Sequence, residues 1–230
     1  MKYLGGKSRL GKEIAHQVRC RLRSGINTIL EPFCGACWVT QYFYYGTVIA
    51  SDLCESLILM HQAIQRGWEP PDYISESEYD EMRHVYNEGE INPLIGFCGF
   101  AASWGGKWFG GYARGDSRNY CLEAKRSILK KHKNLKHVTF QYRNYKNLNP
   151  ENCLIYCDPP YHGTTRYSFG ISDISKFWDT MRKWSERNIV IISEYRAPKD
   201  FKCIWECEHV KSVGTGQTVE RLFQCMHQKT

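Results

Sequence analysis

Five short apolar runs, separated by longer polar or helix-like stretches, constrain the fold of this chain more than any other feature of its sequence. Each run is short, rich in β-branched residues and bounded by turn-forming or polar residues, as buried strands are; the runs span residues 28–30, 48–50, 138–140, 154–157 and 189–193. Residues 8–23 and 38–45 read as helices. This alternation predicts an α/β domain with a mostly parallel sheet. Residues 201–209 and 220–227 would add two antiparallel strands.

The regular alternation of strand-like apolar runs and helix-like stretches stops between about residues 53 and 136. Helix-like segments, a Pro-Pro pair at 70–71 and a stretch rich in Gly, Trp and Phe take its place. We therefore expect residues 1–55 and 136–230 to form one domain, with residues 56–135 as a largely helical insertion.

Positive charge is concentrated in one segment. Residues 105–146 hold 11 Lys and Arg against 2 acids, whereas the whole chain has a formal charge of +7. A basic block on a near-neutral remainder indicates a polyanion, most commonly nucleic acid. The alternative for residues 121–137 is a solvated helix face.

Composition excludes several other classes of protein. No apolar run approaches the roughly 18 residues of a membrane span, and the first residues contain no apolar signal segment. The 11 cysteines, many in apolar contexts, argue against a disulfide framework and for a reducing compartment. We expect a cytoplasmic, DNA-associated protein, and a phage or viral origin also fits.

The most informative segment follows the fourth apolar run and reads Asp158-Pro159-Pro160-Tyr161. It is expected at the carboxyl end of a strand, where open α/β sheets bind ligands. The prolines stiffen the backbone, so a carboxylate, a carbonyl and a ring surround one point. Asp158 and the Pro159 carbonyl can accept both N–H groups of an exocyclic amine while Tyr161 stacks on its base. An edge turn capped by Asp158 is the alternative.

In order and spacing, the motifs of this chain resemble those of the Dam-like DNA adenine-N6 methyltransferases (D12 class, alpha group), which use S-adenosylmethionine. The resemblance covers residues 1–55 and 138–223. It implies a Rossmann-like sheet of the class I methyltransferase type, with the insertion as target-recognition region. The matching segments are Tyr3-Leu4-Gly5-Gly6-Lys7, Glu31-Pro32-Phe33-Cys34-Gly35-Ala36, Ser51-Asp52, Asp158-Pro159-Pro160-Tyr161, residues 189–194 and Glu220-Arg221-Leu222-Phe223.

The candidate cofactor residues also make physical sense. Backbone N–H groups at Gly6 and the Lys7 ammonium suit the cofactor carboxylate. Gly35 lets the backbone approach a ligand, and Asp52 suits the ribose hydroxyls, with a helix cap as the alternative. By resemblance, Asn144 would meet the adenine. The full predicted set is Tyr3, Gly6, Lys7, Glu31, Pro32, Phe33, Gly35, Asp52, Asn144 and Asp158.

The cofactor loop departs from the family pattern. Cys37 and Trp38 stand where the family carries a second glycine and a small residue, so the path of the loop is open. Cys34 and Cys37 form a lone C-x-x-C. Without a second pair beside it, we interpret these as buried thiols and predict no metal site.

In the insertion, aromatic rings alternate with cations in a Gly-rich segment, a composition suited to contacts with duplex DNA around an extruded base. Some of these rings should instead form a small core. The predicted DNA-binding residues are Lys107, Tyr112, Arg114, Arg118, Lys125, Arg126, Lys130 and Lys131.

The sequence thus favours an adenine-N6 DNA methyltransferase acting on a short duplex site, as in restriction-modification. A cytosine-N4 methyltransferase and a catalytically inactive DNA-binding module of the same fold remain alternatives. We expect S-adenosylmethionine as cofactor, double-stranded DNA as partner, no obligate protein partner, and a monomer or weak dimer. The recognised DNA site stays open.

Overall fold

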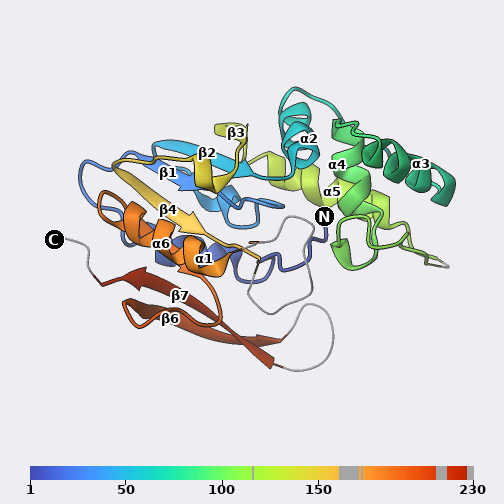
Figure 1. Cartoon of the computed structure of the whole chain (residues 1–230). Coiled ribbons are helices and arrows are strands. Elements are labelled where there is room, and N and C mark those ends of the chain that lie inside the picture. The colour runs from blue at the N-terminus through green and yellow to red at the C-terminus, as the bar shows by residue number, and fades with distance from the viewer. Residues whose placement is uncertain (116, 161–170, 172, 211–216, 227–230) are drawn as a thin grey trace.

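A seven-stranded mixed sheet forms the centre of the protein (Figure 1). The computed structural model describes all residues except 116, 161–170, 172, 211–216 and 227–230. The strand order is β3-β2-β1-β4-β5-β7-β6, with the first five parallel and β7 antiparallel to both β5 and β6. The strands are β1 (Thr28–Glu31), β2 (Thr47–Asp52), β3 (Val138–Tyr142), β4 (Cys153–Cys157), β5 (Ile189–Ser193), β6 (Phe201–Val210) and β7 (Gln217–Cys225).

The predicted α/β class, with a mostly parallel sheet, is confirmed. All five apolar runs form strands, and the run at 189–193 has the observed bounds of β5. The two C-terminal segments form the expected antiparallel strands. The part of the second beyond Met226 lies outside the described residues.

Helices cover both faces of the sheet because successive residues of a buried strand point to opposite sides. Ile29 shares a core with α1 (Gly11–Arg19), whereas Leu30 shares a core with α6 (Ile174–Ser185). The same alternation continues along β4 and β5. Near-continuous apolar strands therefore bury both of their faces.

Two helix expectations are corrected. The helix expected at 8–23 is shorter, because residues 8–10 form a turn before α1. The one expected at 38–45 is wrong: only a 3-10 turn, η1 (Thr40–Tyr42), forms there. Seven of those eight residues are aromatic or β-branched, which are poor helix formers, and the loop is held by burial of Phe43.

Four helices lie between β2 and β3, beside the sheet (Figure 1). They are α2 (Glu55–Gln65), α3 (Glu76–Asn87), α4 (Pro93–Ala101) and α5 (Tyr120–His132), with a short 3-10 turn, η2 (Trp104–Gly106), between the last two. They share an apolar core that also takes in Met1 and Ala36. Ile58 of α2 packs on the sheet core instead. The insertion is therefore anchored to the sheet through α2.

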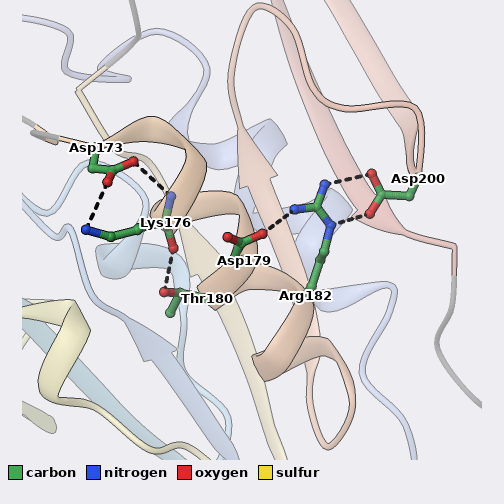
Figure 2. Close-up of polar contacts among 6 residues, drawn as sticks. All are labelled: Asp173, Lys176, Asp179, Thr180, Arg182 and Asp200. Carbon is green, nitrogen blue, oxygen red and sulfur yellow. Dashed lines mark hydrogen bonds and ion pairs between the residues drawn. The ribbon is translucent and has the colours of Figure 1, made fainter.

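A polar network fastens α6 to the segment before β6 (Figure 2). Asp173 caps the helix by accepting the Lys176 backbone N–H at 3.1 Å. One turn from its end, Arg182 donates two hydrogen bonds to Asp200, at 2.6 and 3.0 Å. The bidentate geometry fixes the helix over the face it covers.

The order of the strands locates the ligand-binding edge. Parallel strands β1, β2, β4 and β5 end on the same edge, and the order reverses between β1 and β4. Ligands bind at such a switch point in open α/β sheets. A third 3-10 turn, η3 (Tyr145–Asn147), follows β3 at this edge.

Candidate active site

The predicted catalytic segment begins where β4 ends, at the switch point. Asp158 follows Cys157 directly, and its side chain is 17% exposed. Pro159 is buried and Pro160 is half-buried. Tyr161 lies outside the described residues. The structure thus places the carboxylate at the ligand edge, as the sequence predicts.

Lys7 reaches the same point from the N-terminal segment. Its Nζ donates to Asp158 Oδ1 at 2.7 Å and to the Gly5 carbonyl oxygen at 3.2 Å, and it lies 3.8 Å from Glu220 Oε2. Only 7% of this side chain is exposed. Lys7 and Asp158, 151 residues apart in sequence, therefore form one buried ion pair.

Burial sets the proton affinity of this pair. It raises the pKa of Asp158 to about 6; the Lys7 ammonium opposes that shift and the Glu220 carboxylate adds to it. For Lys7, burial acts to lower the pKa, but the charges of Asp158 and Glu220 outweigh it and the pKa is raised. The site therefore holds a charged lysine beside an unusually basic carboxylate.

The loop after β1 holds the next predicted group. Glu31 is buried, and its Oε2 accepts the Thr40 hydroxyl at 2.7 Å. Burial raises the pKa of this carboxyl well above its ordinary value. Pro32 is buried, and Phe33 packs its ring against Tyr145, with centroids 5.2 Å apart.

Asp52 and Gly35 join β2 to this loop. Asp52 is 8% exposed; its Oδ2 accepts the Gly35 N–H at 2.9 Å and its Oδ1 the Cys54 N–H at 3.0 Å. Cys54 is the N-cap of α2, and no side chain caps that helix, so the alternative of Asp52 as its cap is wrong. Burial raises the pKa of Asp52 although both hydrogen bonds act to lower it.

Two glycines bring Tyr3 and Lys7 close to the loop. Gly35 has a φ of +46°, and a Cβ there would lie 2.8 Å from the Tyr3 ring. At Gly6 a Cβ would lie 2.9 Å from the Trp38 ring. The predicted cofactor residues of the two N-terminal motifs are thus in direct contact.

Cys37 and Trp38, which depart from the family pattern, belong to the loop after β1. Cys37 takes a φ of +56°, a conformation that favours glycine. Its Sγ lies 3.5 Å from His61 Nε2, and His61 Nδ1 lies 2.9 Å from His132 Nε2. The contact with His61 ties the loop to α2, and the second histidine extends the cluster to α5.

Lys131 belongs to the same cluster. It is 3% exposed, donates to the Ala36 carbonyl oxygen and lies 3.8 Å from the centroid of the Trp38 ring. Burial lowers its pKa to about 8. The structure therefore places this predicted DNA-binding lysine inside the protein, where its ammonium meets a backbone carbonyl and the Trp38 ring.

Asn144 caps η3, with its Oδ1 accepting the Lys146 N–H at 3.0 Å. It is half-buried and follows β3, two positions beyond Tyr142. A contact between Asn144 and a cofactor adenine stays a prediction.

Three of the predicted DNA-binding cations form ion pairs with acids of the insertion. Arg114 pairs with Glu76, Arg118 donates to Glu123 at 2.6 and 2.7 Å, and Lys125 lies 2.8 Å from Asp72 and 3.1 Å from Glu69. Lys107, Arg126 and Lys130 are exposed and form no ion pair with any described residue. The exposed charge available to a polyanion is therefore smaller than the composition suggests.

The aromatic side chains of the insertion divide into two groups. Trp108 is 9% exposed and packs on Phe100 and Phe109, and the Tyr112 hydroxyl donates to the Ile74 carbonyl oxygen at 2.7 Å. In contrast, Trp104 is 63% exposed. The expected small aromatic core is present, and Trp104 stands outside it.

Sequence reasoning gave no role to several residues near Asp158. Glu194 and Glu220 are buried and raise its pKa, and the Tyr156 hydroxyl lies 2.8 Å from Ser193 Oγ. His61 and His132 were likewise unassigned. The available signal for Glu220 was its place in the segment Glu220-Arg221-Leu222-Phe223, which resembles a strand motif of the family.

The remaining features concern metals, thiols and membranes. Outside the undescribed segments, no group of three or more His, Cys, Asp or Glu side chains could hold a metal ion. All 11 cysteines are free thiols. No helix among the described residues has the length and apolar character needed to cross a membrane.

Weak similarities to solved structures extend over most of the chain. A conserved hypothetical protein of Streptococcus pyogenes is 10% identical over 88% of each chain, with a TM-score of 0.36. A putative methylase of Haemophilus influenzae is 9% identical over 93% of this chain and 89% of its own (TM-score 0.36). Precorrin-6y C5,15-methyltransferase of Geobacter metallireducens is 9% identical over 93% and 86% (TM-score 0.38).

Sequence comparison is more specific. No curated protein matches the chain. Residues 3–91 match the family model described as D12 class N6 adenine-specific DNA methyltransferase. This segment contains Lys7, the loop after β1, and Asp52. Residues 3–91 are thus similar to the same family that the sequence motifs of this chain resemble.

Proposed function

We propose that the protein transfers a methyl group from S-adenosylmethionine to the N6 amine of adenine in a short duplex DNA site, with the base extruded from the helix. The proposal depends chiefly on the Asp158 carboxylate at the end of β4. It is buried, basic and paired with Lys7. The family match supplies adenine as the expected base.

The residues at this edge fit the cofactor. Asp52, buried at the end of β2, has carboxylate lone pairs beyond the two used by Gly35 and Cys54, and these suit a ribose diol. Gly35, whose positive φ suits glycine, lies in the loop at the switch point and donates its N–H to Asp52. Phe33, Glu31, Tyr3 and Asn144 are the other candidate contacts. When bound, S-adenosylmethionine supplies an electrophilic methyl group on a sulfonium.

Asp158 and Pro159 would orient the target amine. The lone pair of an exocyclic amine is shared with its ring, so the nitrogen is a poor nucleophile while it stays planar. Acceptors at the Asp158 carboxylate and the Pro159 carbonyl would hold its two N–H groups and turn the lone pair towards the methyl. Among described residues only Lys7 donates to this carboxylate, at Oδ1. Positioning of this kind supplies several kcal/mol, up to roughly 7–11 in well-oriented models.

Asp158 is also placed to receive a proton. Nucleophilic attack forms the N–C bond and leaves the nitrogen with one proton in excess, while the bond electrons return to sulfur. With its pKa raised to about 6, Asp158 is a stronger base than an ordinary carboxylate. It can accept the proton from the amine and release it to water.

The insertion would hold the DNA. Lys107, Arg126 and Lys130 suit phosphate contacts, and exposed Trp104 suits stacking beside an unpaired position. Backbone contact between Leu4 and Gly106, 3.1 Å from N to O, ties the Trp104 turn to the segment that carries Lys7. Arg114, Arg118 and Tyr112 line a cavity of about 260 Å³, the candidate for site reading.

Expression in a host without adenine methylation, followed by long-read sequencing of its plasmids, tests the proposal. We expect N6-methyladenine at one recurring short motif, and none with Asp158→Ala. N4-methylcytosine would assign the alternative base. Unmodified plasmid combined with S-adenosylmethionine binding, detected as a rise in Tm, would point to an inactive module.

A further inference from the structure

Glu220 lies beside the catalytic carboxylate although it belongs to the antiparallel part of the sheet. It is in β7, which pairs with β5, and only 3% of the residue is exposed. Its Oε2 is 3.8 Å from Lys7 Nζ, which is itself 2.7 Å from Asp158 Oδ1. One buried ammonium therefore faces two carboxylates, at unequal distances.

The groups around Asp158 are mostly acidic. Among the described residues, the N-terminal segment gives one cation, β1 and β7 each give a buried acid, a third buried acid directly follows β5, and a tyrosine lies two positions before Asp158 on β4. These groups are Lys7, Glu31, Glu194, Glu220 and Tyr156. With three further acids nearby, the position of Lys7 decides how well Asp158 is compensated.

The contact between Lys7 and Asp158 conflicts with the proposed reaction. Lys7 occupies Oδ1, and a tightly bound ammonium withdraws acceptor strength from the carboxylate that should hold an amine N–H. Moving Lys7 away without another partner would strand a buried charge, which is costly. Glu220 offers that partner, because a displacement on the order of 1 Å would bring Nζ into hydrogen-bond range of its Oε2.

We propose, on the basis of the function proposed above, that Glu220 is a positioning residue that takes over Lys7 as the target amine engages Asp158. Glu220 acts through Lys7 and does not touch the substrate. Its negative charge also raises the proton affinity of Asp158, which suits a group that must receive a proton. The pair Lys7–Glu220 thus leaves the catalytic carboxylate available and basic.

Glu220→Gln tests this role, with Glu206→Gln as matched control on the same hairpin. Glu206 is an exposed β6 residue that pairs with Arg221, next to Glu220 in sequence. We expect Glu220→Gln to lower kcat roughly tenfold with KM values for DNA and cofactor within about twofold. Because a negative charge near Asp158 is lost, the acid limb of the pH–rate profile should move to lower pH. Glu206→Gln should change neither.

Wild-type kcat and an unshifted acid limb in Glu220→Gln would overturn the proposal. A lower Tm with kcat and acid limb unchanged would show a structural role only. If Glu220→Gln fails to fold, Glu220→Asp serves as the second variant, because it keeps the negative charge but shortens the side chain. The acid limb of its pH–rate profile should stay in place while kcat falls. A wild-type kcat in Glu220→Asp would also contradict the role.

A second measurement separates this proposal from the proposed function. The carboxyl ¹³C resonance of Asp158 can be titrated by NMR in the ligand-free protein, with no methyl transfer needed. Glu220→Gln should lower the Asp158 pKa, and an unchanged titration would overturn the electrostatic coupling. Absence of methyl transfer in the wild type would count against the function alone.

Discussion

The ion pairs at the sheet edge and those on the insertion of this protein differ in exposure. Lys7 and Asp158 have side chains only 7% and 17% exposed, whereas Arg114 and Glu76 are 73% and 45% exposed. An exposed pair contributes about 0–1 kcal/mol, while removing one partner of a buried pair costs about 3–5 kcal/mol. The buried ion pair therefore holds the catalytic carboxylate in place, whereas the exposed pairs of the insertion can break at little cost and leave their cations for another partner.

The largest expected effect is at the buried centre. Asp158→Ala should lower kcat by roughly 10³-fold or more, because the amine loses both an acceptor and a base. Single-turnover methyl transfer measures this. Circular dichroism should show a folded protein, since Glu220 still faces Lys7. Activity of Asp158→Ala near the wild-type level would remove Asp158 from the mechanism.

Asp52→Ala should weaken S-adenosylmethionine binding by about 1.5–3 kcal/mol, the value of a charge-assisted hydrogen bond. Calorimetric titration measures the dissociation constant, and DNA affinity in gel shift is the control that should stay unchanged. The variant should also lower Tm, because the Gly35 and Cys54 N–H groups lose their acceptor. An unchanged cofactor dissociation constant would contradict the ribose role.

The pH dependence should follow Asp158. The ionised carboxylate is the active form, so kcat/KM should reach its plateau well above the Asp158 pKa and fall as pH drops through about 6. The loss should approach tenfold per pH unit below that point. The measurement is a pH–rate profile with constant ionic strength. A midpoint near the ordinary Asp pKa of about 3.9 would mean that Asp158 is solvated in the working enzyme.

At the exposed region the expected effects are smaller and depend on salt. Changing Arg126, Lys130 and Lys133 to Gln should reduce the log–log salt slope of DNA binding by about 0.9 per lost phosphate contact. Lys183, Lys199 and Lys202, exposed around α6 and β6, provide the control triple variant. Equal slopes for both triple variants and the wild type would make α5 a solvated face.

The smallest effect tests the exchangeable pairs. Glu76→Gln frees Arg114 from its acid, so DNA affinity should rise up to about fivefold, the equivalent of an exposed pair worth about 1 kcal/mol. Fluorescence anisotropy at low salt measures this, and the gain should shrink as salt screens the charges. Unchanged affinity would place Arg114 outside the DNA interface.

Local patterns predicted the sheet and its ligand edge well. The strands were readable because each is a short apolar run, and Asp158 because it follows one directly. The helix at 38–45 was mispredicted because aromatic residues there fill a loop. The burial of Lys131 could not be predicted either, because in the sequence it belongs to a lysine-rich stretch. Its ammonium is buried because α5 packs where Lys131 can donate to the Ala36 carbonyl oxygen.

Contacts between residues far apart in the chain could not be predicted from a single sequence. Lys7 and Asp158 are 151 residues apart, and Glu220 comes from the reversed strand β7. Their contact depends on strand order, which no local pattern encodes. The acid partners of Arg114 and Lys125, which reduce the exposed charge of the insertion, come from residues 69–76 for the same reason.

The most direct test uses purified protein, duplex DNA and S-adenosylmethionine with an isotopically labelled methyl group. After enzymatic digestion, mass spectrometry of the nucleosides identifies the labelled product. The account predicts labelled N6-methyldeoxyadenosine with the wild type and none with Asp158→Ala. Label in N4-methyldeoxycytidine, no labelled nucleoside with the wild type, or equal labelling by Asp158→Ala would contradict it.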